Sequence, residues 1–537
     1  MLALVCSLAV LLGACTPGRG EGTTPHEERH ESPAPAVPLP AGVYGKDDRV
    51  LRVAVGDPAT LDPMRVKDPA SMQVARQLYE GLTRWDPVAG KVVPAVGRSW
   101  RVSDGGRTFT FRLRRDARFH NGTPVTAEHF ALAFDRIASK RNGSDLAYAL
   151  DDIRGFAAVN RKGTANHLSG IRTPDPHTLV ISLARPFADF PAVLTHPGLV
   201  PVLPGRLRRA GFWLEPIGNG PFRMARTWSP GDPVYLRAFE GFFSPPRLDG
   251  IAFLPFPSPE ASWPYLEAGS LQVAEVPPSR IESARRELGS AGEVPILAGY
   301  YYGLNLKAPG LRDIRLRRAV NRAIDRARLA AHVFDGTLRV PRGIVPWGLP
   351  GFGDNACGDL CDYDPKAAAA LVAKLPRGHR SITLQFTQGS PHETVAHEIA
   401  RYLRAAGLDV ELRPFSLGRY LRMLARGEQR LFRLSWIAEY PTPDVFLTDL
   451  FSSSSPDDYF GFDDPKVDRL LARARRATQD YLREALYKRA EFLILRRAPI
   501  VPIGSYVSHW VARPEVQNIH FDVMGGFDAS SVGLAGG

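Results

Sequence analysis

The chain has 537 residues, 44% of them hydrophobic, and 68 Lys and Arg against 56 Asp and Glu give a formal net charge of +12. This composition is that of an ordinary folded protein and excludes general disorder and a multi-span membrane protein. The length is too great for one hydrophobic core, so two or three lobes are expected, and the 47 Pro and 49 Gly favour a mixed α/β fold over a helical bundle.

The excess of basic residues does not indicate a nucleic-acid partner. The basic runs at 112–115 and 473–476 belong to a chain in which acidic residues are interleaved throughout, as on solvated protein faces. Neither zinc-finger spacing nor an aromatic-glycine RNA-binding strand accompanies them. We therefore predict no binding of nucleic acid.

An export signal is predicted at the N-terminus. Residues 2–12 form an apolar run that is too short to span a bilayer but has the length of a signal-peptide core. The run ends in Leu-Gly-Ala directly before Cys15, which resembles the bacterial lipobox. The resemblance implies a signal peptide over 1–14 and lipidation of Cys15, with a buried helix that contains a chance cysteine as the alternative.

The segment 15–46 is rich in Pro, Gly, Glu and His and has almost no large apolar residues. It is therefore predicted to be a disordered tether that starts at the lipidated cysteine. A lipid anchor with such a tether would hold a folded body beside a membrane. No later segment resembles a transmembrane span.

The folded body begins with alternating apolar residues that predict a strand over 49–55, followed by a turn-rich loop and a helix. A hairpin is predicted over 100–113, where apolar and polar residues alternate on both sides of an Asp-Gly-Gly turn. Thr126 is the predicted N-cap of the next helix, whose inward stripe is Phe130, Phe134 and Ile137.

In the second half, apolar residues at four-residue spacing predict helices over 316–324 and 395–403. An alternating strand over 408–412 follows the second of these at once, so this half consists of helix-then-strand units. Two last helices lead to an apolar strand over 499–503. The whole is predicted to be a large α/β body.

Cys357 and Cys361 are the only cysteines after Cys15. Zinc would need four ligands, and no second pair of Cys or His lies nearby, so no metal site is predicted. A short-loop disulfide in an oxidising compartment is the preferred interpretation, with free thiols as the alternative.

Motifs of common enzyme classes are missing from the sequence. It contains no Gly-x-Ser-x-Gly nucleophile elbow and no Gly-x4-Gly-Lys-Ser/Thr phosphate loop. His392 and His397 resemble a zinc-protease helix with one residue too many, because a five-residue step places the second imidazole about 140° round the helix from the first. The chain is predicted not to be an enzyme and to need no cofactor.

Four segments carry a family resemblance. They are the stretch from Leu-Tyr-Glu-Gly-Leu at 78–82 onward to 128, Pro-Ile-Gly-Asn-Gly-Pro-Phe at 216–222, the segment 302–326, and Trp-Ile-Ala-Glu-Tyr-Pro-Thr-Pro-Asp at 436–444. In this order they resemble the extracytoplasmic solute-binding proteins of dipeptide and oligopeptide ABC importers, solute-binding protein family 5. Together the similar segments extend over most of the chain from about residue 50 to 510.

The resemblance implies a periplasmic-binding-protein-like α/β fold of the large three-domain type. Domain I would comprise 47–81, 215–298 and 500–537, domain II 82–214, and domain III 299–499. Domains I and III would close about a hinge of crossing strands and enclose the ligand between them. A membrane permease and a cytoplasmic ATPase would be the partners.

The same resemblance implies a binding residue. In peptide-binding relatives an acidic residue two positions before a proline pairs with the α-amino group of the peptide, and Glu439 is the matching residue here. An enclosed ammonium needs a countercharge and oxygen acceptors, which a carboxylate supplies. A rim position or an internal ion pair is the alternative for Glu439. Trp436 would be a wall of the side-chain pocket, and Tyr440 is a further candidate for contact with the ligand.

Further candidates lie in other segments. Strand alternation sends Tyr300 and Tyr302 to one face of the strand that enters domain III, and Tyr301 to the other. One face is expected to meet the ligand, with core packing as the alternative. Asn219 offers an amide between two glycines, where a backbone can approach a ligand closely, and holding a turn is its alternative role.

We therefore expect a lipid-anchored, extracytoplasmic binding protein that captures short peptides and delivers them to a permease. The alternatives are the same importer role for a nickel chelate, haem or an oligosaccharide, and a lipid-anchored hydrolase.

Overall fold

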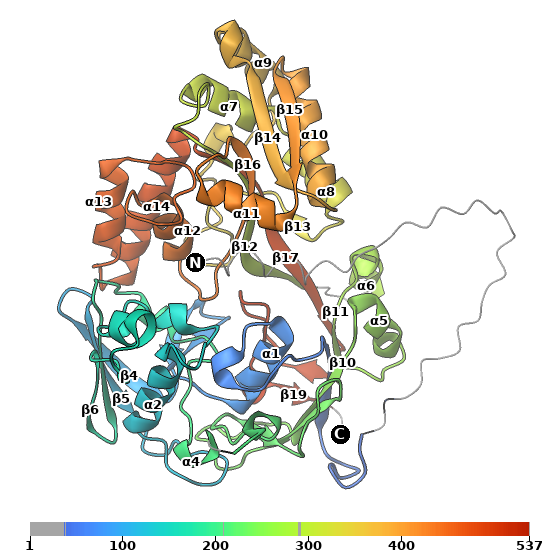
Figure 1. Cartoon of the computed structure of the whole chain (residues 1–537). Helices are drawn as coiled ribbons and strands as arrows, with labels where there is room; N and C mark the ends of the chain where they lie inside the picture. Colours follow the sequence, from blue (N-terminus) through green and yellow to red (C-terminus); the bar gives the residue numbers. More distant parts are fainter. Residues whose placement is uncertain (1–36, 38, 208, 288–291, 536–537) are drawn as a thin grey trace, which may run out of the picture.

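The computed structural model describes residues 37, 39–207, 209–287 and 292–535. The predicted signal peptide, Cys15 and the first part of the predicted tether lie outside these residues. Within the described chain, no helix is long and apolar enough to cross a membrane. Figure 1 shows a mixed α/β molecule in which two long strands, β12 and β17, connect an upper part to a lower part.

One mixed sheet runs through both parts. Its strands lie in the order β15 (Asp409–Phe415), β14 (Ser381–Thr387), β16 (Leu431–Ile437), β12 (Gly292–Leu304), β17 (Ile500–Ala512), β11 (Val273–Glu275), β1 (Val50–Val55), β10 (Gly250–Pro255), β9 (Val234–Ala238) and β8 (Phe222–Met224), and β13 (Leu338–Arg339) pairs with β17 beside this order. The predicted first strand is confirmed as β1, which lies inside the sheet and parallel to both of its neighbours. The strand predicted over 499–503 is confirmed as the start of the much longer β17.

β12 and β17 pair antiparallel, but their register shifts between Pro295 and Gly299. In this interval the main chain of Leu297 turns to other partners. Its N–H donates to the carbonyl of Val523 (3.1 Å), and its carbonyl accepts from the N–H of Ala438 (2.8 Å). Two continuous strands with a local irregularity form a connection on which two bodies can bend.

We call the part that contains β1 and β8–β11 lobe I. Its helices and remaining strands are α1 (Pro69–Leu78), α5 (Pro259–Glu267), α6 (Ile281–Glu287), β18 (Val516–Gln517) and β19 (Gly533–Leu534). Alternate residues of β1 enter two hydrophobic clusters on opposite faces of the sheet, with Leu51 and Val53 in one and Val50 and Ala54 in the other. This half of the sheet is therefore covered on both faces.

The packed structure of lobe I begins before residue 47. The hydroxyl of Tyr44 lies within hydrogen-bonding distance of the carbonyls of Leu236 (2.9 Å) and Ile251 (3.0 Å). A ring docked on β9 and β10 is not part of a free tether, so the predicted tether boundary at residue 46 is too late. The prediction rested on the composition of the segment, and a single anchoring tyrosine hardly changes that composition.

Lobe II contains a hairpin, a four-stranded sheet and the helices around it. The elements are β2 (Thr83–Asp86) with β3 (Lys91–Pro94), the sheet β4 (Gly97–Ser103), β5 (Thr108–Leu113), β7 (Thr178–Ser182) and β6 (Ile171–Asp175), and α2 (Ala127–Ala138), α3 (Phe190–Val193) and α4 (Pro204–Leu207). The predicted hairpin is confirmed as β4 and β5, and Thr126 is the N-cap of α2. Phe130 and Phe134 of that helix enter one contiguous core.

Lobe III contains β13–β16 and most of the helices. These are α7 (Ile314–Ala323), α8 (Arg326–Val333), α9 (Pro365–Ala373), α10 (His392–Ala405), α11 (Leu417–Ala425), α12 (Asp444–Phe451), α13 (Pro465–Ala474) and α14 (Asp480–Arg497). One core packs α7–α10 on one face of the sheet, and a second packs α11–α14 on the other. Figure 1 shows α13 and α14 directly above lobe II.

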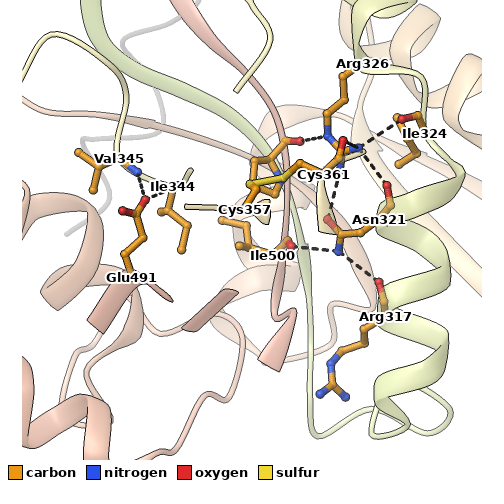
Figure 2. Close-up of a disulfide and its surroundings, with 11 residues drawn as sticks. Arg317, Asn321, Ile324, Arg326, Ile344, Val345, Cys357, Cys361, Glu491 and Ile500 are labelled. Carbon is orange, nitrogen blue, oxygen red and sulfur yellow. Dashed lines mark hydrogen bonds between the residues drawn. A yellow bond between two sulfur atoms is a disulfide. The ribbon is translucent and has the colours of Figure 1, made fainter. Parts of the chain in front are cut away.

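Cys357 and Cys361 form a disulfide in lobe III (Figure 2). The carbonyl of Cys361 accepts a hydrogen bond from Arg326 (2.9 Å), whose buried guanidinium also donates to the carbonyls of Asn321 (2.9 Å) and Pro502 (2.6 Å). The bridge therefore closes a loop over a buried cation that donates to main-chain carbonyls and to the side-chain oxygen of Asn321.

Glu491 of α14 is a buried carboxylate with a comparable role (Figure 2). One of its oxygens accepts from the N–H groups of Ile344 (2.7 Å) and Val345 (3.0 Å). Burial raises the pKa of Glu491 to about 7. Arg326 and Glu491 are thus examples of buried charges with a structural role, because both have hydrogen-bond partners within the protein. Other charged side chains can be compared with them.

Candidate functional site

Glu439 lies two residues beyond the end of β16, in the segment 438–444 that leads into α12. Ala438, the residue before it, donates its N–H to Leu297 at the irregularity of β12. The carboxyl group is thus positioned where the two halves of the large sheet meet. The sequence resemblance pointed to this residue, and the structure places it at the junction on which the lobes can bend.

The carboxyl group of Glu439 lacks an internal partner. Its Oε2 is buried and accepts no hydrogen bond from any described residue. Burial raises the pKa of Glu439 to about 7, and the positive charge of Lys67 from lobe I acts in the opposite direction. Lys67 itself pairs with Asp145 (3.2 Å). Glu439 is half-buried, and a carboxylate with a buried oxygen that lacks a donor is suited to a cationic donor from outside the chain.

Arg433 of β16 was not singled out from the sequence and has the opposite charge. It is 5% exposed and stands opposite Tyr302 in the β12–β16 register. Nη2 donates to Ser435 (2.8 Å), but Nε is buried without a partner, and no carboxylate among the described residues lies within ion-pair distance. One signal for it exists in the sequence, because Arg433 is a lone charge inside the apolar run Leu-Phe-Arg-Leu.

Hydroxyl groups without partners gather around this arginine. The ring of Tyr300 lies 5.3 Å from its guanidinium carbon, and the hydroxyls of Tyr302 and Tyr506 are buried without a hydrogen bond to any part of the described chain. The Tyr300 hydroxyl is 3.1 Å from Nδ1 of His392. Burial and the charge of Arg433 lower the pKa of His392 to about 3, so its imidazole is neutral at pH 7. A guanidinium beside hydroxyl groups that are free to donate hydrogen bonds is typical of an anion-binding site.

The predicted tyrosine alternation is confirmed. Tyr300 and Tyr302 enter the core that packs α7–α10, whereas Tyr301 enters the core on the opposite face. The hydroxyl of Tyr301 donates a hydrogen bond to the carbonyl of Ile344 (2.5 Å). Core packing, the stated alternative, thus describes all three rings, and the free hydroxyl of Tyr302 is what remains available for a ligand.

Trp436 and Tyr440 flank Glu439 in the sequence and are anchored differently. The indole N–H of Trp436 donates to the carbonyl of Val445 (2.8 Å), and the ring is 3% exposed in the core of lobe III. Tyr440 packs against the cores of both lobe II and lobe III. Both rings therefore fix the segment that carries Glu439.

Asn219 lies apart from this group. Its Oδ1 accepts from the N–H of Glu80 (3.1 Å), and its Nδ2 donates to the carbonyl of the same residue (2.9 Å). The amide of this buried residue is occupied by main-chain partners, which favours the stated alternative of a residue that holds a turn. Among the residues described, no group of three or more His, Cys, Asp or Glu side chains is placed to hold a metal ion.

Comparisons with known proteins give a consistent assignment. The sequence model of "Bacterial extracellular solute-binding proteins, family 5 Middle" matches residues 91–458. The chain is 28% identical over 490 residues to the probable deoxycholate-binding periplasmic protein YgiS of Escherichia coli (strain K12), covering 88% of this chain and 91% of that protein. It is also 28% identical over 498 residues to the periplasmic murein peptide-binding protein MppA of the same organism, covering 89% and 92%.

Solved structures show the same fold. The unliganded open form of MppA has a TM-score of 0.81 at 24% identity and covers 91% of this chain and 98% of its own. Another structure, of E. coli MppA, has a TM-score of 0.67 at 24% identity. The fold is of the large, multi-domain periplasmic-binding-protein type, and these relatives are binding proteins rather than enzymes. The chain therefore belongs to the bacterial extracellular solute-binding proteins of family 5.

Proposed function

We propose that this protein captures short peptides outside the cell membrane and delivers them to the permease and ATPase of an ABC importer. The observation that carries the proposal is a pair of separated, unsatisfied charges of opposite sign, Glu439 and Arg433. A short peptide is a zwitterion whose ammonium and carboxylate groups match these two charges. The names of the murein peptide-binding and oligopeptide-binding relatives support the same ligand class.

In this mechanism Glu439 holds the α-ammonium group of the peptide, and Arg433 with the free hydroxyls of Tyr302 and Tyr506 holds a carboxylate. Trp436 and Tyr440 shape the wall beside the N-terminus. Each of the two charges gains a partner that the described chain does not supply, and this partner offsets the cost of removing the charge from water. Side chains of the peptide would lie in hydrated space, which permits broad specificity.

Closure follows from the two crossing strands. We assign domain I to 47–81, 215–298 and 500–537 together with the preceding Tyr44, domain II to 82–214, and domain III to 299–499. Domain III would rotate toward domain I about the irregular part of β12 and β17 and enclose the peptide. The ligand-free protein would populate an open arrangement, and the peptide would shift the equilibrium toward the closed one.

Location and anchoring follow the sequence. We infer export by the signal peptide at 1–14 and attachment to the membrane through lipidated Cys15, with the body outside the cytoplasm. The Cys357–Cys361 bridge is the form expected in such an oxidising compartment. The permease and the ATPase would then act as partners on the membrane and behind it.

A second ligand class has support of its own. One relative is named as a probable deoxycholate-binding protein, and an organic acid of that kind would satisfy Arg433. It would leave Glu439 without a cation, so the two candidates differ at that residue. Nickel chelates, haem and oligosaccharides likewise fail to supply an ammonium group.

The test is native mass spectrometry of the body from residue 37 onward, purified from a bacterial host without denaturation. A series of added masses that fragment as short peptides is the expected result. A single mass of an acidic amphiphile, a chelate or a sugar would replace peptide by that class. A bare protein would be titrated with a peptide library and with deoxycholate, and binding of deoxycholate alone contradicts the proposal.

A further inference from the structure

The segment 438–444, which we call the Glu439 loop, is held by contacts to three different parts of the protein. At its start, Ala438 donates to the carbonyl of Leu297 (2.8 Å) on the crossing strand β12. Near its end, the hydroxyl of Thr442 donates to the carboxylate of Asp189 in lobe II. At the end itself, the carboxylate of Asp444 accepts from Arg475. The loop is therefore not supported by lobe III alone.

The contact between Thr442 and Asp189 is buried, and Asp189 also forms an ion pair with an arginine. Thr442 has no exposed surface, and its oxygen also accepts from the N–H of Asp444 (3.3 Å). Asp189 precedes α3 of lobe II and pairs with Arg483 of α14 (3.2 Å), and 14% and 12% of these two side chains are exposed. The carboxylate of lobe II is thus fixed by an arginine while it accepts from the loop.

Arg475, which holds Asp444 at the end of the Glu439 loop, also connects lobe III to lobe II. Its guanidinium joins Asp444 of the loop to Asp152 of lobe II (2.7 Å) and donates to the carbonyl of Pro186 (3.1 Å). The carbonyl of Arg475 accepts from the N–H of Ala188 (2.7 Å). The lobe II segment 186–189 therefore contacts both the arginine and Thr442, as the position of α13 and α14 on lobe II suggests (Figure 1).

Tyr440 completes the arrangement between these contacts. It packs against the cores of lobe II and lobe III, and its carbonyl accepts from the N–H of Thr442 (2.9 Å). If these contacts served only to join the lobes, helices α13 and α14 would suffice for them. Two of the contacts instead end on the loop itself, within five residues of the unsatisfied carboxyl group of Glu439.

We propose that Asp189 of lobe II is a positioning residue for ligand binding, because through Thr442 it fixes the loop that presents Glu439. This inference rests on the proposed function, in which Glu439 receives the peptide ammonium group. It gives lobe II, which lies outside the closing pair of domains I and III, a direct part in recognition. Binding at Glu439 then depends on the contact of Thr442 with Asp189 of lobe II.

The test measures selectivity rather than affinity alone. Dissociation constants are determined by calorimetry for a short peptide and for its N-acetylated form, and their ratio reports how well Glu439 meets the ammonium group. The wild-type ratio is expected to be about 30 or more in favour of the free amino group. Thr442→Val removes only the hydroxyl and should reduce this ratio at least about tenfold, whereas Thr442→Ser keeps a donor and should restore it.

A matched control separates positioning from general destabilisation. Thr83 is a buried threonine of lobe II whose hydroxyl donates to the carbonyl of Pro191 (2.8 Å), two residues after Asp189, and not to the Glu439 loop. Thr83→Val should lower the unfolding midpoint as Thr442→Val does, and it should leave the ratio unchanged. If both variants reduce the ratio alike, the positioning role is wrong.

The remaining outcomes distinguish the two proposals. If Glu439→Gln abolishes the selectivity and Thr442→Val does not, the inference is overturned and the proposed function stands. If Glu439→Gln itself preserves the selectivity, the proposed function fails and the inference with it. Should Thr442→Val not fold, Asp189→Asn weakens the same hydrogen bond to a neutral one, and an unchanged ratio in that variant overturns the inference.

Discussion

Arg433 and Glu439 lie on and just beyond the same strand and carry opposite charges in buried surroundings, yet they form no ion pair with each other. Neither side chain has a charged partner within ion-pair distance in the part of the chain that the structure describes, and each has one buried polar atom without a hydrogen bond. Arg326 and Glu491, in the same lobe, show the usual solution, with main-chain partners for each charge. Arg433 and Glu439 therefore differ from these structural charges, because each has a buried polar atom without a hydrogen-bond partner among the described residues.

Replacing Glu439 with Gln should weaken peptide binding by about 2–5 kcal/mol, because an enclosed ammonium loses its countercharge. Isothermal titration with one short peptide at neutral pH measures this change. Glu491→Gln is the matched control, since Glu491 is also buried in lobe III but is occupied by Ile344 and Val345. Equal affinity of wild type and Glu439→Gln would show that the ammonium group binds elsewhere.

The affinity for peptides should depend on pH through the same residue. The pKa of Glu439 is about 7, so the carboxyl group is protonated below that value and has no charge to offer. Affinity should therefore rise as the pH increases through 7 and fall again above about 8, where α-amino groups lose their proton. Calorimetry across this range checks both limbs. Glu439→Gln should lack the lower limb, and a lower limb that persists in this variant contradicts the assignment.

Arg433→Met should change stability and binding in opposite directions. Removal of a buried charge without a counter-ion should raise the free energy of unfolding, by on the order of 1 kcal/mol, while affinity for a free peptide carboxylate falls. Urea unfolding and titration with a peptide and its C-terminal amide measure the two effects.

Arg317→Met supplies the contrast for that experiment. The buried guanidinium of Arg317 donates to the carbonyls of Leu311 (2.7 Å) and Arg497 (2.8 Å), so its loss should destabilise the protein without affecting binding. A destabilised Arg433→Met with unchanged affinity would assign Arg433 to the core instead.

Glu491→Gln should stabilise the protein in a pH-dependent manner. The folded-state pKa of Glu491 is raised to about 7, so its stabilising protonation is complete below the ordinary value near 4.5 and is lost as the pH rises through 7. Gln keeps the acceptor oxygen and has no charge. The advantage of the variant in urea unfolding should be near zero at about pH 4.5 and reach about 3 kcal/mol above pH 7. An advantage that does not change with pH would exclude this cause.

Local features of the fold were predictable from the sequence. Alternation predicted β1 and the β4–β5 hairpin, and the cap at Thr126 marked the start of α2, because neighbours in the sequence determine each of these. The helix predicted over 316–324 is confirmed as α7, which begins two residues earlier, at Ile314, and ends one residue earlier, at Ala323. Ile324 continues the four-residue apolar spacing but has an extended backbone, because Asp325 caps the separate helix α8.

The site was predictable only where a family motif marks it. Glu439 was found through its motif. The absence of an ion-pair partner for Arg433, in contrast, depends on three strands that come from distant parts of the chain and lie side by side in the sheet. Asn219 shows the reverse case, since its amide looked available until Glu80 was seen to occupy it. The contact of Thr442 with Asp189 likewise joins two lobes, and periodicity carries no information about it.

The position of β17 also sets an order of assembly. β1 is synthesised first but pairs with β10 and β11, and β17, which joins both halves of the sheet, comes near the C-terminal end. A chain that stops before Ile500 would have two half-sheets with open edges and no strand to join them. Completion of the fold therefore waits for nearly the whole polypeptide, and such late, non-local pairing is slow. An exported chain with this topology would keep the unfolded state that translocation needs until its last strands have emerged.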